Sequence, residues 1–114
     1  MRVDTRPRRQ NSGKAAIERS HLPHLQWLRG RPCVVAATGG CEGRMEAAHV
    51  DHAGGKGASL KVADYKAVPL CQGHHAELHR GAKTFEAKHR IDLVTAAAAY
   101  AAKSPHRGRW ANVA

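Results

Sequence analysis

Residues 71–80 read Cys-Gln-Gly-His-His-Ala-Glu-Leu-His-Arg, which places one cysteine and three histidines close together. If a helix begins near Cys71, His75 and His79 are four residues apart and share one face. A helix presents two imidazoles to one metal ion in this way. His74 points about 100° away from His75 and follows Cys71 at a spacing suited to a zinc knuckle. The stretch therefore predicts one short helix that serves two metal sites, and a solvated histidine-rich helix is the simpler alternative.

Two more cysteines, Cys33 and Cys41, are separated by seven residues. The three cysteines of the chain are an odd number, so a complete disulfide framework is excluded. With His74 and Cys71 they make a Cys3His set, which is typical of structural zinc in a reducing cytosol. The alternative is three buried free cysteines that act as small hydrophobic residues. We expect Cys33, Cys41, Cys71 and His74 to hold a structural Zn²⁺.

The composition points to a small basic protein. The 114 residues include only two Trp, two Tyr and one Phe, and a core so poor in large side chains usually needs a staple such as a metal. A net charge of +10 is typical of nucleic-acid binders, although a basic protein without a polyanionic partner is the alternative. No apolar run is long enough for a signal peptide or a membrane span. We therefore expect a cytoplasmic protein that does not associate with membranes.

Changes in composition divide the chain into three parts. Residues 1–20 are predicted to form a basic flexible arm, because they hold too little apolar surface to offset the entropy cost of ordering. Residues 21–104 are predicted to form the folded domain, and residues 105–114 a basic tail. Within the domain we expect a short helix over 21–29 and an alanine-rich helix over 91–103, with Leu93, Val94, Ala97, Tyr100 and Ala101 on its packing side.

The middle of the chain predicts strands. Residues 31–37 are expected to form a short strand, and residues 45–51 a second one. A glycine-containing loop over 53–63 leads to a further strand over 64–70, which runs directly into Cys71. Two strands joined by a long loop and followed by a metal-binding helix make a β-β-α unit. The predicted fold class is therefore α+β.

Three basic residues are predicted to contact nucleic acid. Lys56 and Lys61 lie in the glycine-containing loop, where the backbone can approach a phosphate closely. This loop is not a P-loop, because the G-x-x-x-x-G-K-[ST] pattern is absent. Arg80 lies at the end of the predicted metal-binding helix.

The stretch Glu46-Ala47-Ala48-His49-Val50, the glycine loop and Val68-Pro69-Leu70-Cys71-x-x-His-His-x-x-x-His resemble the HNH, or His-Me finger, endonucleases. The likeness is greatest to small phage and prophage members, including the Ref-type recombination-associated nucleases. It covers residues 31–80, with weaker similarity to about residue 104. The resemblance implies a small zinc-stabilised ββα-metal unit with flanking helices.

The resemblance also implies a function for single residues. His49 would be the general base that takes a proton from the attacking water. His75 and His79 would hold one catalytic divalent ion, Mg²⁺ or Mn²⁺, that stabilises the departing 3′ oxygen. The implied products are a 5′-phosphate and a 3′-hydroxyl. The implied partners are DNA and a recombinase or another phage recombination protein.

The sequence departs from the family pattern at two positions. Many HNH enzymes have a metal-binding His or Asp just before the base, where this chain has Ala48, and Asp51 is a possible substitute. The Asn that orients the base falls at or near Lys66, so Asp64 is expected to take part of the orienting role. Lys66 could contact a phosphate instead. These departures favour the alternative function, a zinc-stapled nucleic-acid-binding module without catalytic activity.

The general base has a second candidate. Asp51-His52 resembles the Asp-His pair of other HNH enzymes, and its distance from Cys71 suits that pattern. The Ala-Ala-His context favours His49. We therefore expect His49 to be the base and keep His52 as the alternative.

Overall fold

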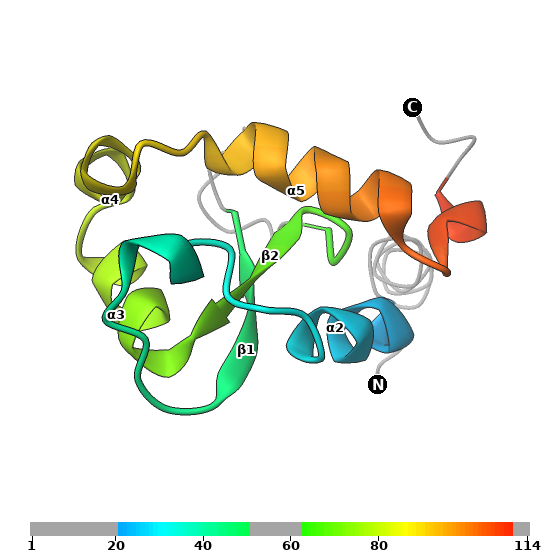
Figure 1. The fold of residues 1–114 in the computed structure, drawn as a ribbon. Coiled ribbons are helices and arrows are strands. Elements are labelled where there is room, and N and C mark those ends of the chain that lie inside the picture. The colour runs from blue at the N-terminus through cyan, green and yellow to red at the C-terminus, as the bar shows by residue number, and fades with distance from the viewer. Residues whose placement is uncertain (1–20, 51–62, 111–114) are drawn as a thin grey trace, which may run out of the picture.

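The computed structural model describes residues 21–50 and 63–110 of the 114-residue chain. It is a small α+β structure in which the described residues form a two-stranded sheet and four α-helices (Figure 1). The elements are, in chain order, α2 (Leu22–Arg29), the 3-10 helix η1 (Ala36–Thr38), β1 (Met45–His49), β2 (Ala67–Cys71), α3 (Gln72–Arg80), α4 (Ala82–His89), α5 (Leu93–Lys103) and the 3-10 helix η3 (Arg107–Arg109). No helix among the described residues is long and apolar enough to cross a bilayer.

The two strands pair antiparallel, with a register that runs from Met45 opposite Cys71 to His49 opposite Ala67. All five residues of β2 are buried, because α5 packs against this strand and α2 packs against both strands. Figure 1 shows α3 continuing directly from β2, with α4 beyond it. The predicted order of strand, strand and helix is therefore present over these residues.

The prediction of a strand over residues 31–37 is wrong. This segment turns into η1, and its described backbone link to the sheet is a hydrogen bond of 2.9 Å from Val34 N–H to the Pro69 carbonyl. Pro69 directs its carbonyl and its ring nitrogen away from β1, towards this segment. Because proline has no N–H, the outer edge of β2 lacks a donor at this position, and a regular third strand cannot continue along it.

The hydrophobic core lies between the sheet, α4 and α5. Its largest side chains that are fully buried include Phe85, Leu70 and Leu93. On α5, Leu93, Ala97 and Ala101 recur every four residues and are buried as predicted, whereas Val94 is 40% exposed and does not belong to the packing side. The helix begins two residues later than predicted, because the Asp92 side chain accepts a hydrogen bond from Thr95 N–H and caps it.

Residues 105–110, which were predicted to begin a basic tail, pack against the domain. The Trp110 ring stacks on Tyr65 at a centroid distance of 5.3 Å and meets His24 edge-on at 4.8 Å. Its Nε1–H donates to the Ala101 carbonyl at 3.3 Å. Trp110 therefore connects the end of α5 to α2 and to the segment before β2.

His24 is a buried histidine in the described core. The residue is fully buried, and its Nδ1 lies 2.9 Å from the Ser104 hydroxyl oxygen. Its Nε2 has no hydrogen-bond partner. Burial lowers the pKa of His24 to about 4, with a smaller contribution from His21 and His106. The ring is therefore neutral in the folded protein at neutral pH.

We expect His24 to weaken the fold in acid. The unfolded chain binds a proton at this ring near the ordinary pKa of 6.5, whereas the folded chain resists it down to about 4. Stability from the neutral ring is therefore full above pH 6.5 and is lost as the pH falls towards 4. The loss should be on the order of 3 kcal/mol. It would be measured as the difference in unfolding free energy between the wild type and His24→Gln, in which this group cannot titrate. Parallel pH profiles for the two proteins would contradict the prediction.

Candidate metal centres and the His49 site

The predicted Cys3His set comes together in the structure. One donor atom from each of Cys33, Cys41, Cys71 and His74 lies within 4.8 Å of all the others. The Nδ1 atom of His74 is 3.1 Å from the sulfur of Cys71, 3.4 Å from that of Cys33 and 3.8 Å from that of Cys41. Donors around one tetrahedral zinc ion are separated by about 3.5–3.8 Å. The four residues therefore fit a structural zinc ion, with His74 binding through Nδ1.

Cys71 sits at the junction that defines this cluster, because it ends β2 and caps the N-terminus of α3. Its sulfur accepts hydrogen bonds of 3.4 Å from the backbone N–H groups of Glu42 and His74. Burial alone raises the pKa of this thiol, but the two amides and the neighbouring thiols outweigh that effect, so the pKa of Cys71 is lowered. A thiolate is the form that binds zinc. The hydrogen bonds from the two backbone amides therefore favour the thiolate form of Cys71.

The loop between Cys33 and Cys41 folds back on itself so that both sulfurs reach α3. Gly39 and Gly40 each have a φ of +81°, a left-handed conformation that side chains other than glycine rarely adopt. A side chain at position 40 would also lie 3.7 Å from Nε2 of His74. These two glycines let the chain reverse after η1, which explains how a C-x7-C spacing serves one site.

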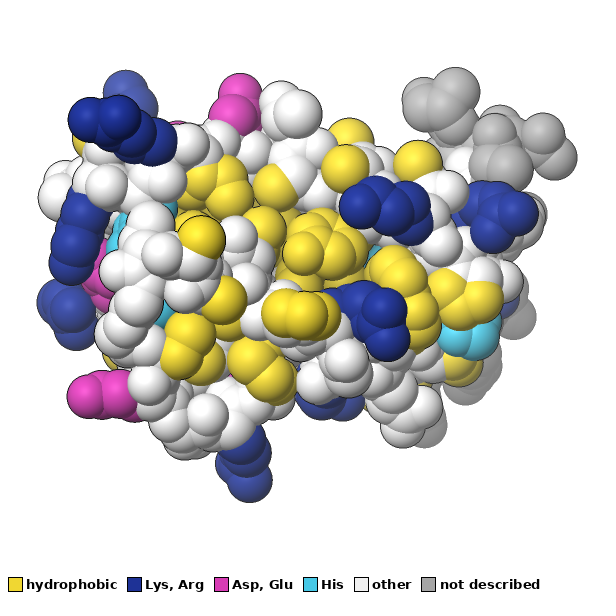
Figure 2. Space-filling model, viewed as in Figure 1, with side chains coloured by type: hydrophobic (Ala, Val, Ile, Leu, Met, Phe, Trp, Pro, Cys, Tyr) yellow, Lys and Arg dark blue, Asp and Glu magenta, His cyan; other side chains and the backbone are white. Residues whose placement is uncertain are grey.

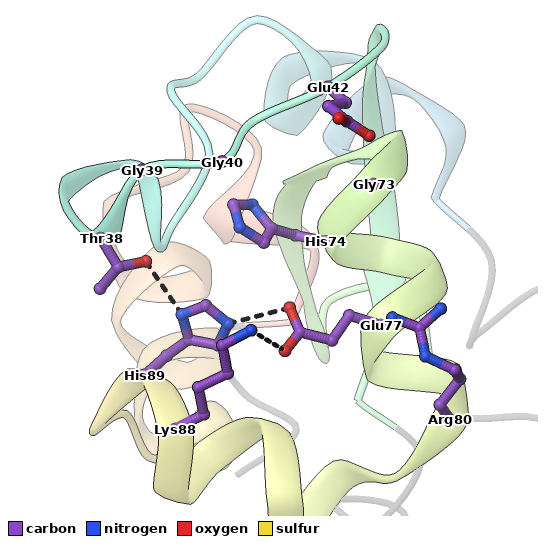
Figure 3. A pocket seen from close by; sticks show the side chains of 10 residues that line it. All are labelled: Thr38, Gly39, Gly40, Glu42, Gly73, His74, Glu77, Arg80, Lys88 and His89. Carbon is purple, nitrogen blue, oxygen red and sulfur yellow. Dashed lines mark hydrogen bonds and ion pairs between the residues drawn. The ribbon is translucent and has the colours of Figure 1, made fainter.

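A pocket of about 510 Å³ lies on the far side of His74, between η1, α3 and α4 (Figure 3). Its walls include Glu77, His89 and Lys88, which sequence reasoning did not identify. Glu77 accepts from His89 Nε2 at 3.0 Å and pairs with the Lys88 ammonium at 3.0 Å. No short sequence spacing predicts these contacts, because Glu77 is on α3 and the other two residues are on α4.

His89 bridges Thr38 on η1 and Glu77 on α3 through its two ring nitrogens. The Thr38 hydroxyl donates its proton to the Val35 carbonyl at 2.8 Å, so it must accept from His89 Nδ1 at 2.9 Å. The other nitrogen faces the Glu77 carboxylate. His74, Glu77 and His89 also bring three donors within 4.8 Å of one another, and the hydrogen bonds from His89 and Lys88 lower the pKa of Glu77. We therefore describe the group as a charged clamp between η1, α3 and α4.

The predicted base, His49, is the last residue of β1 and contacts Asp64. Its Nε2–H donates to one oxygen of Asp64 at 2.9 Å, and the other oxygen accepts from the His21 backbone N–H at 2.7 Å. The His49 side chain is 37% exposed, so water can reach it. Lys66 lies one residue before β2, with its ammonium 6.0 Å from the centre of the Tyr65 ring. Asp64 is thus in hydrogen-bond contact with His49.

His75 and His79 share one face of α3, as their spacing predicts. Their rings stack with centroids 4.8 Å apart and an angle of 28°. Nδ1 of His75 lies 2.7 Å from a carboxylate oxygen of Glu46 on β1. This hydrogen bond lowers the pKa of Glu46, which is therefore ionised. The side chains as they stand do not gather three donors within 4.8 Å here, unlike the two groups above found among the described residues.

The predicted nucleic-acid contacts are only partly visible. Lys56 and Lys61 lie outside the described residues, and so does His52, the alternative candidate for the general base. Arg80 ends α3, is exposed and lines the pocket beside the charged clamp. Figure 2 shows Lys and Arg side chains at the edges of one face and between its apolar groups, with no single continuous stripe.

We expect Cys71→Ser to lose zinc and to unfold the domain. Zinc binding in small sites contributes about 10 kcal/mol or more to folding, which equals the whole stability of an ordinary domain. The wild type should retain one zinc per chain by elemental analysis and lose its cooperative thermal transition in a strong chelator. Ala87→Ser, at an exposed position of α4, should behave like the wild type. A Cys71→Ser protein that keeps one zinc and the same melting temperature would contradict the assignment.

Comparison with known proteins gives a family for this chain. Residues 9–104 match the family described as Protein of unknown function (DUF968), and this range spans most of the 114 residues. No curated protein matches the chain, and no solved structure does. The matched range holds the whole Cys3His set, the His49–Asp64 pair and the two histidines of α3. The chain therefore belongs to the DUF968 family.

Proposed function

We propose that this protein is a metal-dependent DNA endonuclease of the HNH, or His-Me finger, type, built on a ββα-metal unit. The observation that carries the proposal is the His49–Asp64 hydrogen bond at 2.9 Å, on a strand pair that leads into the helix bearing His75 and His79. A histidine paired with a carboxylate is a common general base. The order of these groups along β1, β2 and α3 agrees with the family resemblance.

His49 would act through Nδ1. Its Nε2–H is held by Asp64, so Nδ1 carries the lone pair that can accept a proton from water. Asp64 is itself fixed by the His21 backbone N–H at 2.7 Å, which limits rotation of the whole pair. The His49 side chain is 37% exposed at the end of β1, so water can reach the ring. In hydrolysis it would take the proton of the water that attacks the scissile phosphorus.

His75 and His79 would hold one divalent ion, Mg²⁺ or Mn²⁺, on the same face of α3. When bound, such an ion offsets the charge of the five-coordinate phosphate and stabilises the departing 3′ oxygen. The protein contributes the direction of α3, because Cys71 and His74 fix its first turn at the zinc cluster. Hydrolysis in this arrangement leaves a 5′-phosphate and a 3′-hydroxyl.

DNA is the proposed substrate because the chain carries a net charge of +10. A recombinase partner follows from the resemblance alone, whereas a cytoplasmic location is proposed because a Cys3His set suits a reducing compartment. A second function is a zinc-stapled module that binds nucleic acid without cutting it. Ala48 favours this second function, since it is fully buried at the position where many HNH enzymes have a metal ligand.

A plasmid-nicking assay with Mg²⁺ or Mn²⁺ tests the proposal. His49→Ala should lower the cleavage rate by about 10²–10⁴-fold, the usual contribution of a general base, while His52→Ala retains activity. Asp64→Asn should lower the rate less, because an amide can still accept the Nε2–H of His49 through its oxygen. All variants must contain the same amount of zinc as the wild type.

The other outcomes are equally informative. Loss of activity in His52→Ala alone would move the general base to that residue. Full activity in both variants would exclude a single histidine base. Tight DNA binding with a steep salt dependence, and no cleavage of duplex, single-stranded or branched DNA, would favour the binding module.

A further inference from the structure

We infer that Glu46 is a positioning residue that accepts the Nδ1–H of His75 and so reserves Nε2 of that ring for the divalent ion. The contact joins Glu46 on β1 to the first half of α3 at 2.7 Å, which is shorter than the 2.9 Å contact of His49 with Asp64. Neither the sequence pattern nor the family resemblance assigned a role to this carboxylate. The inference rests on the proposed function for the identity of the ion.

The chemistry of the two groups fixes the position of the proton. An ionised carboxylate can only accept hydrogen bonds, so the nitrogen that faces Glu46 must carry the hydrogen. A neutral imidazole holds one such hydrogen, which leaves the Nε2 of His75 as the atom with a free lone pair. Metal-binding histidines commonly donate their second N–H to a carboxylate, which fixes the tautomer and the direction of the ring. Glu46 and His75 have this arrangement.

The strand register explains why Glu46 can reach α3. Met45 is opposite Cys71, the residue that caps α3, so the next residue of β1 lies beside the first turns of that helix. Glu46 and Ala48 are two residues apart and point to the same face of β1. Ala48 is fully buried and has no donor atom, whereas the Glu46 side chain is 31% exposed and extends to His75. This face of β1 therefore supports the ion through the orientation of His75.

The loss of Glu46 should have a defined effect on ion binding. With Ala48 unable to bind a metal, the two imidazoles of His75 and His79 are the protein ligands of the proposed site. Removal of an outer hydrogen-bond partner typically weakens metal binding by about 10–100-fold. The stacked rings, 4.8 Å apart, give His75 little room to find another orientation that serves the same ion.

Nuclear magnetic resonance of the histidine rings tests the first half of the inference without any activity assay. Protein loaded with one equivalent of zinc and no other divalent ion should show His75 protonated at Nδ1, at a pH where the ring is neutral. In Glu46→Ala this preference should be lost. Glu42→Gln removes a charge from an exposed side chain near the start of α3 and should leave the His75 tautomer unchanged. A wild-type His75 protonated at Nε2 would overturn the inference, whether or not the protein cuts DNA.

Titration with Mn²⁺, followed by the electron paramagnetic resonance signal of the free ion, tests the effect of Glu46 on ion binding in the same zinc-loaded proteins. Glu46→Ala, which removes the acceptor of the His75 Nδ1–H, should bind Mn²⁺ about 10–100-fold more weakly than the wild type, and Glu42→Gln should bind it equally well. Equal affinity in Glu46→Ala, with cleavage retained, would overturn the positioning role alone. Absence of Mn²⁺ binding in the wild type would overturn the ion-binding role together with the proposed nuclease.

Discussion

Closure of the Cys3His cluster is the constraint on which the rest of this structure depends. Cys33 and Cys41 come from the loop before the sheet, and Cys71 and His74 come from the junction of β2 and α3. Three thiols and an imidazole gain little stability from lying within 4.8 Å of one another unless they bind a common ion. With the ion, the loop, the second strand and the helix become one unit, which compensates for a core with a single phenylalanine.

Helix α3 directs the neighbouring side chains of His74 and His75 to different sides of the helix. His74 faces inward to the cluster, and the next residue, His75, faces Glu46 on β1. One residue of helix turns a side chain by about 100°, so neighbouring histidines serve different tasks without competing. The charged clamp at Glu77 lies on the inner side and supports the cluster from behind. The outer side carries the stacked imidazoles of His75 and His79, which are the ligands of the proposed divalent ion.

The sequence predicts the contents of α3 well, because helical spacing alone determines which of His74, His75 and His79 share a face. The partners of that helix were harder to find. Glu46 and His89 meet α3 from other elements, and only the β1–β2 register and the packing of α4 bring them near. Cysteine and histidine have few uses in such a combination, so they could be grouped without a structure. Glutamate is common on protein surfaces, so the sequence alone does not distinguish Glu46 and Glu77 from the other glutamates.

Pro69 has a consequence for the behaviour of the protein at high concentration. A sheet of two strands has two exposed edges, and an unpaired edge can recruit a strand from another molecule. The outer edge of β2 has no N–H at Pro69, and its carbonyl there is already bonded to Val34. A foreign strand would therefore find neither a donor nor a free acceptor at the centre of this apolar strand. The residue that prevents a third strand within the chain also protects the sheet against aggregation between chains.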